Sequence, residues 1–152
     1  MDKIKITGHV VITHYDKNMN TIEKEEGHNL VVNSGLQFIA KLINAVSVLP
    51  FKFMAVGTDS TGEDPAQTTL IAEVTTPSNM DRIEGTCTYV ADYTAKISAQ
   101  FTNNSGGNIT LKEAGLFNTA VTGGQMISRK VFADKVMAVS ETLQIDWSLS
   151  VA

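Results

Sequence analysis

A chain of 152 residues suits one domain, and its formal net charge of −4 is the opposite of what a typical nucleic-acid binder carries. Hydrophobic residues make up 43% and charged residues 18% of the chain, which permits a core and argues against general disorder. The single cysteine, Cys87, excludes a disulfide within the chain. We interpret it as a small, half-buried strand residue rather than a reactive thiol.

The N-terminal part of the chain predicts strands. Apolar residues alternate with polar ones over residues 4–12, which is typical of a half-buried strand. Residues 16–20 have turn chemistry, since Asx side chains hydrogen-bond their own backbone. A second strand is expected through Ile22 and a third over residues 30–32, and the acidic run at 23–26 is interpreted as a solvated edge or turn. There is no apolar signal-peptide region at the start and no stretch long enough for a bilayer, so we expect synthesis in a cytoplasm.

A helix at about residues 34–45 is the clearest local prediction. Apolar residues recur there at helical spacing. Ser34 precedes Gln37 by three positions, as in a capping box, where the hydroxyl accepts an amide hydrogen bond and the longer side chain reaches back. With Asn33, these two residues are candidate structural residues at the strand-to-helix junction. Because so wide an apolar face is unfavourable in water, we expect the helix to pack against a sheet.

The rest of the chain predicts strands separated by polar loops. Residues 58–67 are expected to form a surface loop, residues 68–74 a short strand or helical turn, and Gly115 a bulge. Further strands are predicted at residues 51–56, 95–101, 109–117, 126–132 and 143–151. Short connections with almost no helix between strands favour antiparallel pairing. We therefore predict one β-rich domain over residues 1–152, a jelly-roll-like sandwich or barrel with one packed helix.

Catalytic and metal-site patterns are missing from the sequence. His9 and His14 are five residues apart on one predicted strand, so they point to opposite faces, and His28 is distant in sequence although folding can bring it near either one. Residues 57–62 lack the Gly-Lys-Ser/Thr ending of a phosphate loop, and the chain has no nucleophile elbow. We expect no enzyme activity, no cofactor and no metal.

One pair of charges is expected to meet in a hairpin. If residues 111–117 pair with residues 126–132, Glu113 lies near Arg129. Such an ion pair either fixes the register of the two strands or offers one partner to another subunit. Both roles remain open at this point.

Several segments together resemble a known group of proteins. The resemblance is carried by Gly27-His28-Asn29-Leu30-Val31-Val32-Asn33-Ser34-Gly35-Leu36, Phe53-Met54-Ala55-Val56-Gly57-Thr58, Glu113-Ala114-Gly115-Leu116-Phe117, Gly124-Gln125-Met126-Ile127-Ser128-Arg129 and Leu143-Gln144-Ile145-Asp146-Trp147-Ser148-Leu149. In this order they resemble the small all-β virion structural proteins of tailed bacteriophages, over nearly the whole chain. The resemblance implies a component of the phage particle, and it supports this better than any location within the particle. The leading hypothesis is a capsid decoration, or cement, protein of the virion. It would bind the major capsid protein or other virion proteins, with a trimer favoured and with neither nucleic acid nor membrane as a partner.

Two other functions remain open. A tail, baseplate or fibre-associated protein would use the same kind of fold at another place in the particle. A carbohydrate-binding β-sandwich would use exposed aromatic rings, for which Tyr15, Tyr89 and Tyr93 are the candidates. Aromatic residues make up only 7% of the chain, and most lie in apolar phase, which disfavours sugar binding.

Overall fold

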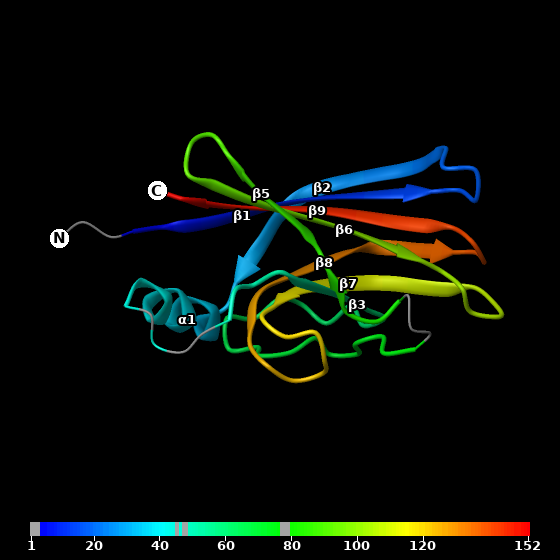
Figure 1. The fold of residues 1–152 in the computed structure, drawn as a ribbon. Coiled ribbons are helices and arrows are strands. Elements are labelled where there is room, and N and C mark those ends of the chain that lie inside the picture. Colours follow the sequence, from blue (N-terminus) through cyan, green and yellow to red (C-terminus); the bar gives the residue numbers. More distant parts are fainter. Residues whose placement is uncertain (1–3, 45, 47–48, 77–79) are drawn as a thin grey trace.

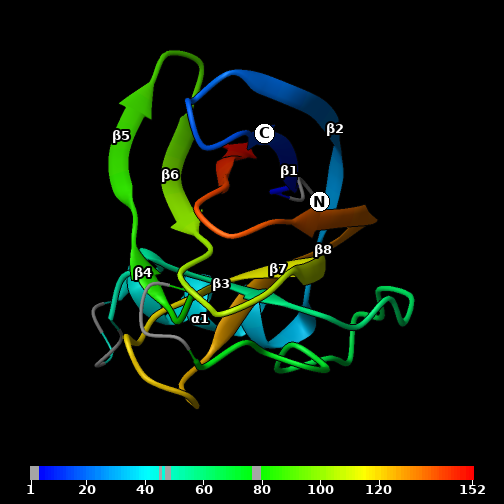
Figure 2. The same cartoon turned by 90° about the vertical axis from the view of Figure 1, so that its right-hand side faces the viewer.

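A nearly closed antiparallel sheet of nine strands forms the body of the computed structural model, which describes every residue except 1–3, 45, 47–48 and 77–79 (Figures 1 and 2). The strands are β1 (Ile6–Tyr15), β2 (Thr21–Val31), β3 (Phe53–Gly57), β4 (Ile83–Glu84), β5 (Thr86–Val90), β6 (Thr94–Thr102), β7 (Ile109–Phe117), β8 (Met126–Met137) and β9 (Thr142–Val151), and the helix is α1 (Asn33–Ile43). Their order in the sheet is β4-β3-β7-β8-β2-β1-β9-β6-β5. This arrangement confirms the predicted mainly-β antiparallel barrel or sandwich with one helix.

The core lies inside this barrel because the strands alternate inward apolar and outward polar residues. On β9 the buried positions Leu143, Ile145 and Trp147 alternate with partly exposed polar ones. Trp147 has no exposed surface, and its neighbours across the sheet are Val10 on β1 and Ile97 on β6. The alternation of apolar and polar residues in the sequence therefore places one face of each such strand in the core and the other in solvent.

The two terminal strands of the sheet, β4 and β5, almost meet and nearly close the barrel. The terminal strands β4 and β5 follow each other in the chain through Gly85, whose amide donates a hydrogen bond to the Lys52 carbonyl at 2.7 Å. Beyond Gly85, β5 continues beside β6 alone. The gap in the barrel therefore lies along β5, which pairs with β6 on one side only, as Figure 2 shows.

The start of α1 differs from the predicted capping box. The N-cap residue is Val32, which makes no side-chain cap hydrogen bond. The Ser34 hydroxyl donates instead to the Met126 carbonyl at 3.2 Å, and the Asn33 amide donates to the Pro65 carbonyl at 2.9 Å. Gln37 is exposed. The prediction was wrong because the N-cap lies two residues before Ser34, which places Ser34 inside the first turn, where it faces β8.

The helix packs on the sheet through a narrow contact. Gly35 is its only fully buried residue, and the Phe38 ring meets the Phe51 ring edge-on at 6.2 Å between centroids. Leu36 and Ile43 keep 47% and 78% of their surfaces exposed. The helix therefore packs against the sheet as expected, through Gly35, Phe38 and Ile39, while Leu36 and Ile43 stay exposed. Residue 45, the last of the predicted helix, lies outside the described residues.

Because α1 lies so close to β8, we expect Gly35→Ala to change the stability in the direction opposite to the usual one for a helix. A Cβ at residue 35 would lie 2.5 Å from the Ile127 carbonyl oxygen and 2.7 Å from its Cα, both backbone atoms that cannot move aside. Gly35→Ala should therefore destabilise the protein by about 1–3 kcal/mol through overpacking, although Gly→Ala inside a helix usually stabilises. Urea unfolding measures this change. Gln37→Ala, on the exposed side of the same helix, should change stability by less than about 0.5 kcal/mol. Equal effects of the two substitutions would contradict the close packing.

Three smaller expectations need correction. The strands expected at Ile22 and at residues 30–32 are the two ends of β2. Residues 68–74 form neither a strand nor a helical turn, and contribute one isolated bridge between Glu73 and Gly57. Gly115 is paired on both sides, and the register irregularities lie next to it, at Leu111/Glu113 and Leu116/Phe117. A Cβ at Gly115 would lie 2.9 Å from both the Leu70 and the Phe117 side chains, so close packing accounts for the glycine.

Candidate functional site

Glu113 and Arg129 form an ion pair inside the protein. Glu113 Oε2 accepts a hydrogen bond from Arg129 Nε at 2.8 Å and lies at the same distance from Arg129 Nη2. Neither side chain is exposed. The other contacts of the pair reach the loop after β3. Glu113 accepts the amides of Ile71 and Ala72 at 3.2 and 2.8 Å, while Arg129 Nη1 donates to Gln67 Oε1 at 3.0 Å. The expected proximity of the two charges is present, and their complete burial favours a role in fixing the fold over a contact with another subunit.

A second buried ion pair connects two residues between β3 and β4 and also contacts the β7–β8 turn. Arg82 donates to both carboxylate oxygens of Glu73, from Nε at 2.6 Å and from Nη2 at 2.9 Å. Its Nη1 donates to the Gly123 carbonyl at 2.8 Å, and its guanidinium lies 3.7 Å from the centre of the Phe117 ring. Arg82 is only 8% exposed. The loop that ends at Arg82 is therefore tied to the β7–β8 turn by charge, hydrogen bonds and stacking.

The sequence contained a signal for both pairs that the strand pattern did not reveal. Arg82 and Arg129 are the chain's two arginines, against ten lysines. Arginine suits buried pairs because its planar guanidinium matches a carboxylate and is less strongly hydrated than an ammonium group. A chain that reserves arginine for two positions thereby marks them as candidates for buried pairs.

A third polar cluster fills the seam between β2 and β8. These strands are paired at Leu30–Arg129 and Val31–Ser128, next to α1. Further along the seam, Lys135 Nζ lies 2.7 Å from Glu25 Oε2 and 3.5 Å from Glu23 Oε2, and the Lys135 side chain is 2% exposed. Glu25 also accepts the Ala133 amide at 3.2 Å. The acidic run at 23–26 lies on β2, where Glu23 and Glu26 stay exposed, as expected of a solvated edge. In addition, Glu23 and Glu25 compensate the charge of the buried Lys135.

Histidine chemistry in the described part of the chain is also structural. His14 Nε2 lies 2.8 Å from Glu141 Oε2, and the His14 side chain is 4% exposed. His9 and His28 meet on the other face of the sheet, with ring centroids 6.0 Å apart. Among the described residues, no group of three or more His, Cys, Asp or Glu side chains is placed to hold a metal ion. No described helix is long and apolar enough to cross a membrane.

One end of the barrel carries α1, the C-terminus and the β5–β6 turn (Figure 1). We call this region the apolar end, and the exposed apolar residues in or next to its elements are Ile4, Leu36, Leu42, Ile43, Val46, Leu49, Tyr89, Val90, Tyr93 and Val151. The strand register supports the grouping, since Val151 lies opposite Ile6 and Ser150 opposite Thr94. A groove of about 530 Å³ between β1, β2 and α1 is lined by Ile4 and Leu36.

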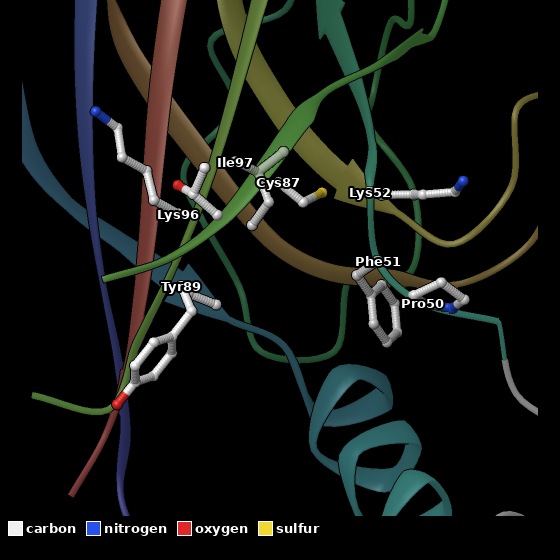
Figure 3. A pocket seen from close by; sticks show the side chains of 9 residues that line it. Pro50, Phe51, Lys52, Cys87, Tyr89, Lys96 and Ile97 are labelled. Atoms are coloured by element: carbon white, nitrogen blue, oxygen red, sulfur yellow. The ribbon is translucent and has the colours of Figure 1, made fainter. Parts of the chain in front are cut away.

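A second groove of about 500 Å³ opens beside β5 (Figure 3). Phe51 and Lys52 line one side, and Cys87, Tyr89 and Ile97 line the other. Cys87 lies on a strand, as expected, but it is exposed rather than half-buried because β5 is an edge strand. Desolvation raises the pKa of the Cys87 thiol, which keeps the thiol protonated and weakly nucleophilic near neutral pH.

The tyrosines considered for sugar binding do not form one platform. Tyr89 and Tyr93 are each 75% exposed at the apolar end. Tyr15 lies at the other end of β1, opposite Thr142, and is partly buried. A flat surface built from all three rings is therefore excluded.

The deeply buried charged side chains Glu113, Arg129, Arg82 and Lys135 are thus engaged in holding strands and loops, while many of the exposed apolar residues belong to the apolar end. This distribution suits a protein that docks onto another surface better than one that binds a small substrate. No family model, curated protein or solved structure matches this chain, so its function is inferred from its own residues.

Proposed function

We propose that this chain is a structural component of a tailed-phage particle, which decorates the assembled head and stabilises it. The observation that carries the proposal is the contrast between a tightly braced interior and the exposed apolar end. Both arginines are used in buried ion pairs, and Ile4, Leu36 and Ile43 remain in solvent. The assignment to a phage particle rests on the sequence resemblance described above, and the choice of the head over the tail is the leading hypothesis.

The braced loops suit such a role because docking is less costly for a rigid surface. A protein whose loops are already ordered loses little conformational entropy on binding. Here the loop of residues 58–74 is tied to β7 and β8 by Glu113 and Arg129, and Glu63 adds a hydrogen bond to the Val131 amide at 2.6 Å. The Asn33 amide donates to the Pro65 carbonyl of this loop, so the braced loop also holds the start of α1.

Stabilisation of the head would follow from mass action. A protein that binds the assembled shell but not its separated subunits lowers the free energy of the shell by an amount that grows with occupancy. Many weak contacts on one particle add up through multivalency. The major capsid protein is the proposed partner, and the apolar end is the proposed contact surface.

A pair of matched variants tests this contact surface. Ile43, at the apolar end, is 78% exposed, and Val136, near the opposite end of β8, is 54% exposed. Ile43→Glu should weaken binding to expanded heads about tenfold or more, because it removes apolar burial and places a charge in the contact. Val136→Glu should bind like the parent chain. Co-sedimentation with heads that lack this protein measures both.

The same assay separates the rival functions. Failure of the parent chain to bind heads would overturn head decoration, and binding to tails instead would favour a tail or baseplate role. Equal binding of the Ile43→Glu and Val136→Glu variants would overturn the proposed contact surface.

A further inference from the structure

Strand β5 is an uncovered edge of the sheet. It is hydrogen-bonded to β6 on one side, and among the described residues nothing pairs with its other side. All five of its residues are exposed. Edge strands that stay free in solution are usually protected by charges, proline, a bulge or very short length. The sequence Thr-Cys-Thr-Tyr-Val of residues 86–90 has no charge and no proline, and its pairing with β6 is regular.

The other end of the sheet differs in each respect. Strand β4 has two residues, and Glu84 at its end is paired with Lys52. Short length and charge together make β4 a poor template for a further strand. The contrast shows that protection is specific to β4, which leaves β5 as the edge available for strand addition.

The sequence of β5 is complementary to itself. In an antiparallel pair of two β5 strands centred on Thr88, Thr86 lies opposite Val90 of the second copy and the two Thr88 residues lie opposite each other. Such pairs of β-branched residues are favourable, and no like charges are opposed within the five residues. A second copy of this chain therefore satisfies the free backbone groups without a repulsive contact.

The groove beside β5 fits the same register. Cys87 and Tyr89 are two residues apart, so they share a face of the strand, and both line the groove of about 500 Å³ (Figure 3). In the Thr88-centred pair, Tyr89 of the second copy lies opposite Cys87. Its ring is then placed at the groove beside Phe51 and Ile97, and the symmetry axis repeats the contact in the other copy.

From these contacts we infer that two copies of the chain associate through β5 about a two-fold axis, each inserting Tyr89 at the groove of the other. Two five-residue strands and two tyrosines form a contact smaller than the roughly 1,200 Å² of a stable interface. The dimer is therefore concentration-dependent in free solution and strengthens when copies are held side by side. The pairing needs no phage particle, and its two-fold symmetry differs from the trimer expected from the sequence.

Cysteine cross-linking tests the register. Residues directly opposite in an antiparallel pair have Cα atoms roughly 4.5–5.5 Å apart, within the range that a disulfide spans. The Cys87→Ser, Thr88→Cys variant should form a covalent dimer under mild oxidation several times faster than the Cys87→Ser, Val121→Cys control. Val121 is 71% exposed in the β7–β8 turn, away from β5, so this control reports random collisions. Equal cross-linking rates would overturn the pairing.

Sedimentation equilibrium over a range of concentrations tests the association itself. The parent chain should show a monomer–dimer equilibrium, and Thr88→Lys should shift it to monomer by placing two ammonium groups opposite each other. Circular dichroism checks that the exposed substitution leaves the fold intact. A parent chain that stays monomeric at the highest concentration, or that forms trimers, would overturn the inference. Because no particle is present, either failure is distinct from a failure to bind heads.

Discussion

We expect Arg129→Met to lower the free energy of unfolding by about 3–5 kcal/mol, because the substitution leaves a carboxylate buried without its counter-charge. Glu113 and Arg129 have no exposed surface, so water cannot replace the missing guanidinium without opening the fold. The loss should extend to the loop after β3, since Arg129 also donates to the Gly62 carbonyl and to Gln67. Urea denaturation followed by circular dichroism measures the free energy, and hydrogen exchange of residues 58–74 measures the loosening of the loop.

The double variant Glu113→Gln, Arg129→Met is the matched control. Glutamine keeps an oxygen that can accept the Ala72 amide, which the parent Glu113 accepts at 2.8 Å, but it carries no charge. If an uncompensated charge causes the loss, the double variant should recover at least about 1 kcal/mol relative to Arg129→Met alone. A loss of less than about 1 kcal/mol for Arg129→Met, or a double variant less stable than the single one, would contradict the bracing role of the pair.

Trp147→Ala should cost a similar amount, about 3–5 kcal/mol, because it removes the largest side chain that is fully buried in the core. The indole lies at the middle of β9, between Val10 and Ile97 of the neighbouring strands. Its Nε1 makes no hydrogen bond in the structure. Urea unfolding has to be followed by circular dichroism, since Trp147 is the only tryptophan and its fluorescence is lost with it.

Trp147→Phe separates the two contributions of this side chain. It keeps an aromatic ring in the core and removes an N–H group that has no partner. We expect a loss of only about 1–2 kcal/mol, from the reduced volume. If Trp147→Phe were as harmful as Trp147→Ala, a hydrogen bond from Nε1 or a tighter fit than the structure shows would have to be invoked.

The fold could be predicted because, in most strands, the apolar residues of the sequence pattern are the ones buried in the structure. On β6 and β9 the alternation of apolar and polar residues continues over the whole strand, and each strand has one face in the core. The helix was placed correctly for the same reason and packs against the sheet as expected, but Leu36 and Ile43 stay exposed. Helical spacing shows that Leu36 and Ile43 lie on an apolar stripe, and it cannot show whether the partner of that stripe belongs to the same chain.

The buried charges illustrate the same limit. Glu113 and Arg129 could be paired in advance because a hairpin fixes which residues of its strands are neighbours. Arg82 and Glu73 lie nine residues apart in an irregular segment, where no period relates one side chain to another. Cys87 was expected on a strand, but the bounds of β5 and its exposure were not predicted, since its five residues are all exposed and have no alternation.

Cryo-electron microscopy of the phage particle to which we propose that this chain belongs tests the central claim most directly. The account predicts density for the barrel on the head surface, with helix α1 and the apolar end turned toward the shell. A particle without this chain, or one that carries it with Leu36 and Ile43 facing solvent, would contradict the claim that the exposed apolar groups serve docking.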